Sequence, residues 1–551
     1  MTILMYEEDN TEDMKMLQQA HDWQSQAFIQ WFSTAPQATK MNVLLRRMTI
    51  KAITGSGKTY LAVMMAVHHL RKSDNSRVVV VVPSVGLLNQ WMSILSGWNI
   101  GNVSGCGGGY RYDAFSPIVV TTKDSLKKLR GHRNLMLGDT FFILDECHNM
   151  AAPKAYDTLE KMIKMGMIQS IVGLSATPER TDGRCIMNIT GRNSKGEPHV
   201  VYAYDDALAD KTVIPNFTVN VGRISRTLLA HETYTPTSVD DSYIGNKLQV
   251  LDAMTTNISK MAASLSKALA EIGVGNNGGG GVNLMHHDCS NPMQAGDLAY
   301  QVQAWKQLCI KRKRLLNNAD IRITIAKQFA EKNLGIKQAI FHESIAGIEK
   351  IATTLREELG IEPFIYHSGE SVADWDLLTH DEKERLATYK ANSQEILAQW
   401  IRSDSGVLLT CKALKEGLNV PDMGAVLLLS HPNAARPTIQ TLGRALRGDR
   451  HDDGTFISDK EIWIINFDVA ADDRVIANIK DTGQIPDSQF KYFTRNANGT
   501  WDSTGDVVMD YDTSQEGPAD ESQEGPADES QEGPAYEGPT TPSNNGETNE
   551  E

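Results

Sequence analysis

Residues 52–59 of this 551-residue chain read Ala-Ile-Thr-Gly-Ser-Gly-Lys-Thr and follow an apolar run expected to form a strand over 48–53. The two glycines allow backbone amides to approach phosphate oxygens at a helix start, where the positive end of the helix dipole lies. Lys58 would reach the β- and γ-phosphates of a nucleoside triphosphate, and the hydroxyl of Thr59 would bind Mg²⁺. The predicted phosphate loop comprises Thr54, Gly55, Ser56, Gly57, Lys58 and Thr59.

A second segment, Asp145-Glu146-Cys147-His148, follows the apolar run 141–144 directly. A carboxylate at the carboxyl end of a parallel strand faces the crevice in which such sheets bind ligands. We expect Asp145 to hold Mg²⁺, and Glu146 to orient and deprotonate the attacking water. His148 would connect this segment to the next motif along the chain.

A third segment, residues 440–447, contains Gln440 and two arginines, Arg444 and Arg447. Residues three apart share one helical face. Both guanidinium groups could stabilise the transferring phosphate as arginine fingers, an effect on the order of 10³–10⁵ in rate. Each segment alone could be a turn or a solvated helix, but three in this order predict a divided site that needs both halves of the chain to close.

Short apolar runs without alternation indicate strands buried on both faces of a parallel sheet. They occur at 78–82, 118–120, 141–144, 171–174, 339–341, 364–366, 407–409 and 426–429. Helical patterns lie between them, as at 60–71 and 85–98. This βα rhythm occurs twice, so the fold class is α/β with two tandem, doubly wound parallel-sheet domains.

The predicted organisation has five parts. They are an ATP-binding domain over 1–225, a helical insertion over 226–330, a second domain over 331–485, an extension over 486–513 and a disordered acidic tail over 514–551. We expect the insertion to link the two halves, because 248–272 and 301–330 have helical spacing. Its cations Lys311–Arg314 could contact duplex or forked DNA or form a solvated face.

The net charge of −15 is concentrated in the tail, which repeats Ser-Gln-Glu-Gly-Pro-Ala-Asp-Glu and contains eleven acidic and no basic residues. The remaining chain carries −4, and a nearly neutral body can still present a basic groove. The tail could be a solubilising appendage, or it could bind a protein partner or mimic DNA.

The six cysteines form no CxxC pair, and no run is long enough to span a bilayer or act as a secretory signal. We therefore expect a reduced, cytoplasmic location and no membrane partner. His286, His287 and Cys289 lack a second ligand pair and predict no metal site. Trp91 and Phe115 could each stack on a base or pack in the core.

The motifs and their order resemble superfamily 2 helicases of the DExH type, especially UvsW-type phage branch-migration helicases and XPB-type repair helicases, over about 20–220 and 330–470. The resemblance implies RecA-like domains, with Gln24 of Asp22-Trp23-Gln24 reading adenine and Ser175-Ala176-Thr177-Pro178 coupling ATP state to domain movement. It places Gly417 and Asn419 at the nucleotide, although many relatives carry Asp where Asn419 stands. UvsW-type proteins also carry an N-terminal module that has no room before residue 22.

By the same resemblance, one nucleic-acid strand is tracked by residues of both halves. They are Pro83, Ser84, Gln90, Thr121, Thr122, Ser125, His342, Ser344 and Thr410. Backbone contacts of this kind position a protein without reading sequence, so we expect little sequence specificity and a clear dependence on salt.

The function expected is that of an ATP- and Mg²⁺-dependent DNA helicase, 3′–5′ in polarity. It would act on single-stranded, forked or branched DNA in branch migration, recombination, repair or replication restart. An RNA or transcript-release helicase and a nucleotide-gated clamp are alternatives, as is a translocating restriction subunit, although no nuclease constellation is evident. The resemblance also suggests a phage or viral origin.

Overall fold

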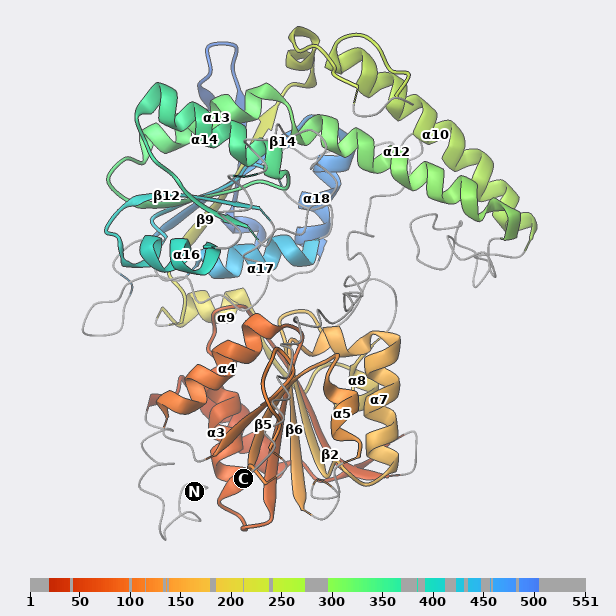
Figure 1. Cartoon of the computed structure of the whole chain (residues 1–551), viewed down its shortest axis with the longest axis vertical. Helices are drawn as coiled ribbons and strands as arrows, with labels where there is room; N and C mark the ends of the chain where they lie inside the picture. The colour runs from red at the N-terminus through yellow and green to blue at the C-terminus, as the bar shows by residue number, and fades with distance from the viewer. Residues whose placement is uncertain are drawn as a thin grey trace, which may run out of the picture.

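The protein folds into two α/β domains, seen one above the other in the computed structural model (Figure 1). The structure describes residues 19–39, 43–98, 102–113, 115–131, 135, 138–178, 185–211, 213–236, 241–272, 296–367, 384, 392–411, 423–430, 435–446, 456, 459–481 and 485–504. The acidic tail, the segment with His286, His287 and Cys289, and residues 416–421 lie outside these ranges.

The first sheet has the order β1-β2-β7-β6-β3-β5-β4, with β8 also paired to β2. Its strands are β1 (Gln37–Ala38), β2 (Leu44–Ala52), β3 (Ser76–Val82), β4 (Val103–Cys106), β5 (Ile118–Thr122), β6 (Asp139–Asp145), β7 (Ser170–Ser175) and β8 (Val200–Tyr202). Apart from β1, which pairs antiparallel with β2, the strands of this sheet pair in parallel. The five valines 78–82 are fully buried, as the absence of alternation predicts for a strand covered on both faces.

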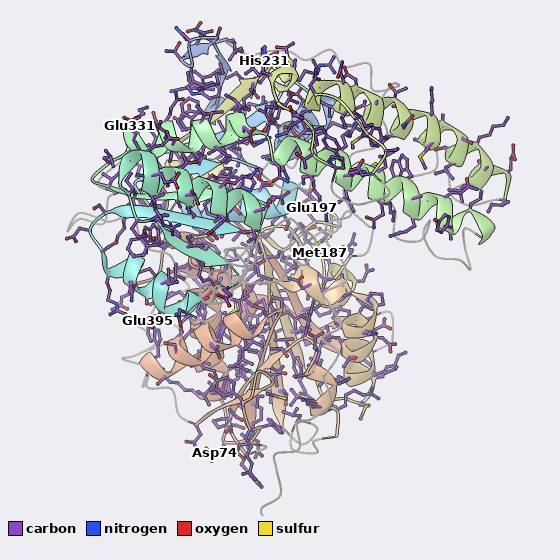
Figure 2. The ribbon with its side chains drawn as sticks, turned by 45° about the horizontal axis from the view of Figure 1, so that its top comes forward. Asp74, Met187, Glu197, His231, Glu331 and Glu395 are labelled. Carbon is purple, nitrogen blue, oxygen red and sulfur yellow. The ribbon has the colours of Figure 1, made fainter. Side chains whose placement is uncertain are left out.

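Helices cover both faces of this sheet. They are α2 (Asp22–Ser33), α3 (Lys58–Leu70), α4 (Val85–Gly97), α5 (Leu126–Leu129), α7 (Pro153–Lys164) and α8 (Met187–Thr190), with the 3₁₀ helix η2 (Cys147–Ala151) after β6. In Figure 2, Asp74, in the turn before β3, lies at the end of the domain remote from the second domain, whereas Met187 lies near the second domain. The carboxyl end of β3 therefore points toward the second domain.

The second sheet has the order β11-β12-β10-β13-β14-β9-β15-β16. Its strands are β9 (Phe217–Ile224), β10 (Lys337–Phe341), β11 (Phe364–His367), β12 (Gly406–Cys411), β13 (Ala425–Leu428), β14 (Lys460–Phe467), β15 (Phe490–Arg495) and β16 (Trp501–Ser503). Only β16 pairs antiparallel among these described strands. Its helices are α13 (Asp320–Lys332), α14 (Ile345–Leu359), α16 (Ser393–Arg402), α17 (Ala435–Ala445) and α18 (Ala470–Asp481). All eight predicted apolar runs lie in parallel strands, so the predicted fold class is confirmed.

Two of the predicted domain boundaries differ from the strand pairing. Residues 217–224, assigned from the sequence to the first domain, form β9, which pairs with β14 and β15 inside the second sheet. The predicted extension over 486–513 supplies β15 and β16 of that same sheet. The sheet to which a strand belongs is decided by hydrogen bonds to distant segments. An apolar run in the sequence does not reveal which strands it will pair with.

The helical insertion is an arm of two helices, α10 (Lys247–Glu271) and α12 (Ala299–Asn317), that extends away from the second domain (Figure 1). Trp305 and Ile258 lie in the apolar seam between them, and the Trp305 indole N–H donates to the Ile258 carbonyl at 3.1 Å. The arm is inserted between β9 and β10 of one sheet. The expectation that it links the two halves is therefore wrong.

The link between the domains is α9 (Tyr204–Ala209) with the residues leading to β9 (Figure 1). Its side chains belong to one continuous apolar core that includes residues of both sheets. Tyr202 stacks on Trp23 with ring centroids 4.8 Å apart, and Tyr204 packs edge-on against Phe217 at 5.7 Å. None of the described helices has both the length and the apolar character needed to cross a membrane.

Candidate active site between the domains

The predicted phosphate loop connects β2 to α3 at the end of the first domain that faces the second. Gly55 and Gly57 have φ values of +89° and +84°, a left-handed conformation that favours glycine. Lys58 begins α3 and is buried, and its Nζ donates to the carbonyls of Ala52 and Ile53 at 3.0 Å each. These two hydrogen bonds hold the ammonium group against the backbone that leads into the loop, at the start of α3.

Asp145 is the last residue of β6 and is buried. Its Oδ2 accepts the indole N–H of Trp91 at 2.8 Å, and its Oδ1 accepts the backbone N–H of Glu146 at 3.0 Å. Burial raises the pKa of this carboxyl, whereas the Trp91 hydrogen bond, the Lys58 charge and the Glu146 amide lower it. The charged form therefore depends on these three neighbours.

Glu146 has φ +46°, the only positive φ among the described non-glycine residues. A left-handed non-glycine residue costs on the order of 1–3 kcal/mol, and such strain gathers at functional sites. This conformation turns the chain sharply from β6 into η2. It thereby places the Glu146 and Asp145 side chains at the same edge of the sheet.

His148 connects this turn to the end of β7. Its Nδ1 lies 2.9 Å from Ser175 Oγ and 3.6 Å from Glu146 Oε2, and its Nε2 accepts an amide N–H of Asn149 at 3.1 Å. This pattern fits an imidazole protonated at Nδ1. Ser175 Oγ also accepts the Thr177 backbone N–H at 3.0 Å. The predicted connection from His148 to the Ser-Ala-Thr segment is present as hydrogen bonds.

Gln24, predicted to read adenine, lies against the phosphate loop. Its Nε2 donates to the carbonyl of Gly57 at 2.9 Å, and its Oε1 accepts the backbone N–H of His21 at 2.9 Å. A Cβ at Gly57 would lie 2.4 Å from Gln24 Nε2, so only glycine permits this approach. The amide of Gln24 is thus placed beside the loop by α2.

The second domain reaches the phosphate loop through α17. A Cβ at Gly443 would lie 2.4 Å from Thr54 Cβ, and a Cβ at Gly55 would lie 3.2 Å from the Gly443 carbonyl oxygen. The helix that carries Gln440 and Arg444 therefore contacts the loop through its backbone. The side chains of Gln440 and Arg444, and all of Arg447, lie outside what the structure describes.

The described residues fit a magnesium nucleotide. The two left-handed glycines, the buried Lys58 and the carboxylate of Asp145 gather at one edge of the sheet, with Thr59 at the start of α3. The hydroxyl of Thr54 is buried without a hydrogen-bond partner in the structure. When bound, Mg²⁺ would neutralise charge on the phosphates.

The hydroxyls predicted to contact nucleic acid are engaged mainly in local hydrogen bonds. Ser84 Oγ accepts from the Leu87 amide and caps α4, and Ser344 Oγ accepts from the Gly347 amide and caps α14. Pro83, Thr121, Thr122, Ser125 and Thr410 are buried. Among the predicted contacts, the half-buried Ser84 and Gln90 are the most accessible.

His342, predicted to contact nucleic acid, is turned into the protein interior in this structure. The side chain is buried, its Nε2 donates to the Asn317 carbonyl at 2.9 Å, and its Nδ1 accepts the Ser344 amide at 3.0 Å. A Cβ at Gly347 would lie 2.2 Å from the His342 ring. The imidazole therefore anchors the end of α12 to the second sheet.

Two of the four cations predicted for duplex contact pair with carboxylates inside the protein. Lys311 lies 2.7 Å from Asp241, and Lys313 lies 2.9 Å from Glu343. Both carboxylate side chains are buried. Lys313 therefore fastens α12 to the second domain, and Lys311 fastens α12 to the segment that leads into α10.

The sequence reasoning missed Trp91 as a neighbour of Asp145, having assigned it to base stacking or to the core. The indole is fully buried, yet its N–H is aimed at a carboxylate 54 positions away. A buried indole N–H needs a hydrogen-bond acceptor, and this requirement was the signal in the sequence that Trp91 would contact a polar group.

Comparison with known families matches one segment in each domain. Residues 18–180 match the family described as Type III restriction enzyme, res subunit, and residues 321–449 match the helicase conserved C-terminal domain. The two matches contain the phosphate loop, the acidic turn and all of α17.

Two curated relatives share part of the chain. A protein named as helicase 22 of the Sulfolobus islandicus filamentous virus (isolate Iceland/Hveragerdi) is 24% identical over 412 residues, covering 72% of this chain and 57% of the relative. The Endoribonuclease Dicer homolog 3b of Oryza sativa subsp. japonica is 27% identical over 174 residues, covering 27% and 11%. The chain thus spans just over half of the viral relative and about a tenth of the plant one.

Among solved structures, the chain is similar to the DEAD-box helicase Mss116 bound to ssRNA and UDP-BeF, at 14% identity, with 90% of this chain and 80% of that chain covered and a TM-score of 0.49. The Pyrococcus furiosus Hef helicase domain is similar at 15% identity, with 84% and 98% covered and a TM-score of 0.45.

Proposed function

Because this chain belongs to the superfamily 2 helicases, with two RecA-like domains, we propose that it couples ATP hydrolysis to movement along DNA. The substrates proposed are single-stranded, forked or branched DNA, and the direction proposed is 3′ to 5′. Branch migration, recombination, repair and replication restart are the processes that need such a motor.

The observation that carries this proposal is the contact of α17 with the phosphate loop. Gly443 approaches Thr54 so closely that a methyl group would not fit between them. Residues on α17 are therefore brought to the loop by the position of the second domain. An ATPase divided in this way can report its nucleotide state as a change in the angle between its domains.

Each described side chain has a role that its geometry supports. Lys58 and the left-handed glycines would hold the phosphates, and Thr59 and Asp145 would hold Mg²⁺. Glu146 would accept a proton from water, with His148 placing it through the 3.6 Å approach of the imidazole. Gln24 would select adenine. Arg444 and Arg447, whose side chains lie outside the described part of the structure, would act from the second domain.

DNA is favoured over RNA by the first family match, whose description names a restriction enzyme. The preference for branched or forked substrates and the polarity rest on the resemblance to UvsW-type and XPB-type helicases. A second candidate, an RNA helicase, is favoured by the partial similarity to a Dicer homolog. The viral relative is consistent with a phage or viral origin.

We also propose that the protein works in the cytoplasm and that its acidic tail recruits a protein partner. The five cysteines in the described ranges are free thiols, which suits a reducing compartment. Purified protein without residues 514–551 should unwind substrate as the full chain does. Loss of unwinding on this truncation would instead make the tail part of the motor.

The deciding experiment compares ATP turnover on single-stranded DNA, forked DNA, a Holliday junction and RNA of matched length at one fixed salt concentration. We expect forked or branched DNA to stimulate most and RNA least. Stimulation by RNA alone would establish the second candidate, and no stimulation by any of the four would favour a nucleotide-gated clamp. Glu146→Gln is the control, since it should bind ATP and show no stimulated turnover.

A further inference from the structure

Trp91 is a fully buried side chain on α4 with a polar contact to the site. Its indole N–H donates to Asp145 Oδ2 at 2.8 Å. Glu146 donates its backbone N–H to the other oxygen of the same carboxylate at 3.0 Å. The two donors approach different oxygens, so together they fix the rotation of the carboxylate about its own axis.

A carboxylate that binds Mg²⁺ needs its remaining lone pairs aimed at the metal. In metal sites, partners that hydrogen-bond to a ligand orient it, and their removal commonly costs about 10–100-fold in metal affinity or activity. Asp145 lies at the end of β6 with little freedom of its backbone, because β6 is paired on both sides by β3 and β7. The rotation of the Asp145 side chain is thus the remaining degree of freedom, and the hydrogen bond from Trp91 restricts it.

α4 also connects this carboxylate to the surface. Ser84 caps the helix and Val85 begins it, and Trp91 lies seven residues after Ser84, about 10 Å along the axis. A Cβ at Gly108 would lie 2.7 Å from Val85 Cγ1, so the first turn of α4 packs against the glycine turn 107–110. Val85 is 43% exposed, so this end of the helix is accessible.

We propose that Trp91 is a positioning residue: its indole N–H holds Asp145 in the orientation that binds Mg²⁺, and α4 transmits nucleic-acid binding at its first turn to that carboxylate. The second half of this statement rests on the proposed function, because it assumes that nucleic acid contacts Ser84 and its neighbours. The role of Trp91 in orienting Asp145 involves only the nucleotide and the metal.

The competing explanation is that Trp91 only packs in the core and that its hydrogen bond to Asp145 has no role in metal binding. The chain offers two matched controls for this explanation. Trp305 and Trp400 are also fully buried, and each donates its indole N–H at 3.1 Å to a backbone carbonyl, of Ile258 and Gly406 respectively. Both lie in the second domain or its arm, away from Asp145.

The test compares Trp91→Phe, Trp305→Phe and Trp400→Phe, each of which removes one indole N–H and a similar volume. Binding of a fluorescent ATP analogue is titrated with Mg²⁺ in the absence of nucleic acid. We expect Trp91→Phe to raise the Mg²⁺ concentration at half-saturation by about 10-fold or more, with metal-free binding of the analogue unchanged. The two controls should stay within about 2-fold of the wild type.

An unchanged Mg²⁺ dependence in folded Trp91→Phe would overturn the proposal. If that variant does not fold, benzothienylalanine at position 91 keeps both rings, replaces the N–H by sulfur and provides the same readout. An equal shift in all three variants would also overturn it, because general loosening would then explain the effect.

Transmission through α4 is tested on the same proteins by ATP turnover with and without single-stranded DNA. We expect Trp91→Phe to reduce the ratio of stimulated to basal kcat at saturating Mg²⁺, while KM for ATP stays near that of the wild type. An altered Mg²⁺ dependence with an unchanged ratio would overturn transmission and leave the metal role in place. Failure of DNA to stimulate the wild type would count against the proposed function instead.

Discussion

Both sheets end in a cluster of buried polar side chains, and the two clusters differ in what their hydrogen bonds reach. In the first domain, Asp145 is bonded to Trp91 and interacts with the charge of Lys58, and His148 is bonded to Ser175 at the end of β7. In the second, Arg322 and His342 point at backbone carbonyls: Arg322 Nε donates to Leu316, and its Nη1 to Leu429 and Ile465. The cluster of the first domain lies at the candidate active site, and the cluster of the second domain holds structural elements together.

The two domains share one architecture, but their polar clusters have separate roles. Parallel strands bring polar residues to the same edge of each sheet. In the second domain that edge holds the helical arm, through the His342 bond to Asn317 and the Lys313–Glu343 pair. In the first domain it holds carboxylates and a lysine at the phosphate loop. Substitutions should therefore affect chemistry in one cluster and stability in the other.

The largest effect is expected for Lys58→Ala. Loss of the ammonium group should lower stimulated ATP turnover at least ~10³-fold, because a fixed cation at the phosphates stabilises charge that develops in the transition state. The melting temperature should change little. Lys161→Ala, at an exposed pair with Asp157, is the control and should retain full turnover. Wild-type turnover in Lys58→Ala would refute the assignment of the loop.

Arg322→Met should instead destabilise the second domain. The guanidinium is buried, lies 3.7 Å from Asp472 and binds carbonyls from two strands; burial lowers its pKa to about 10, so it stays charged at neutral pH. Removing one member of such a group costs about 3 kcal/mol or more in free energy of unfolding, measurable by urea titration. Arg356→Met, at an exposed pair with Glu362, should cost less than about 1 kcal/mol. Similar losses in the two variants would contradict a structural role for Arg322.

The buried His342 should make stability depend on pH. Burial, with a smaller effect from the Arg322 charge, lowers its pKa to about 4 from 6.5. Between these values the unfolded chain binds a proton that the folded chain does not, so stability present above pH 6.5 is lost as the pH falls. From pH 7 to pH 5 the loss should be about 2 kcal/mol. His342→Gln should flatten this slope relative to the exposed His231→Gln; equal slopes would exclude His342 as the source.

The smallest effect is expected at the contact between the two regions. Gly443→Ala places a methyl group 2.4 Å from Thr54 Cβ, so α17 must move away from the phosphate loop. We expect turnover to fall about 10-fold, or ~1.4 kcal/mol, with nucleotide binding retained. Gly97→Ala, a helical glycine whose added methyl meets nothing within 4 Å, should be neutral. Unchanged turnover in Gly443→Ala would show that this contact is not part of the working arrangement.

The sequence was sufficient where local chemistry decides the structure. The valines 78–82 predict a strand buried on both faces. The residues of the phosphate loop and of the acidic turn each follow an apolar run, which predicts that they lie at the ends of strands. It was insufficient where distant segments decide. β9 joins the second sheet because it pairs with β14, more than 200 residues later.

Side-chain orientation was the second limit. A histidine after a strand can face a ligand or the interior, and His342 faces the interior because Asn317 and Ser344 are its partners. Of the two alternatives predicted for Trp91, the structure has core packing, and the acceptor of its indole N–H comes from β6. The roles of Gly417, Asn419 and Arg447 stay predictions, because these residues lie outside the described ranges.

The connection between the domains leaves the first sheet beside the phosphate loop. Ile53 donates its backbone N–H to the Tyr202 carbonyl at 3.1 Å, and the Tyr202 ring stacks on Trp23 of α2. The connection is therefore fastened directly to the residues that flank the phosphate loop. In any rotation about this connection, travel grows with radius, so a sub-ångström adjustment at Tyr202 would sweep the far ends of α10 and α12 through the longest path.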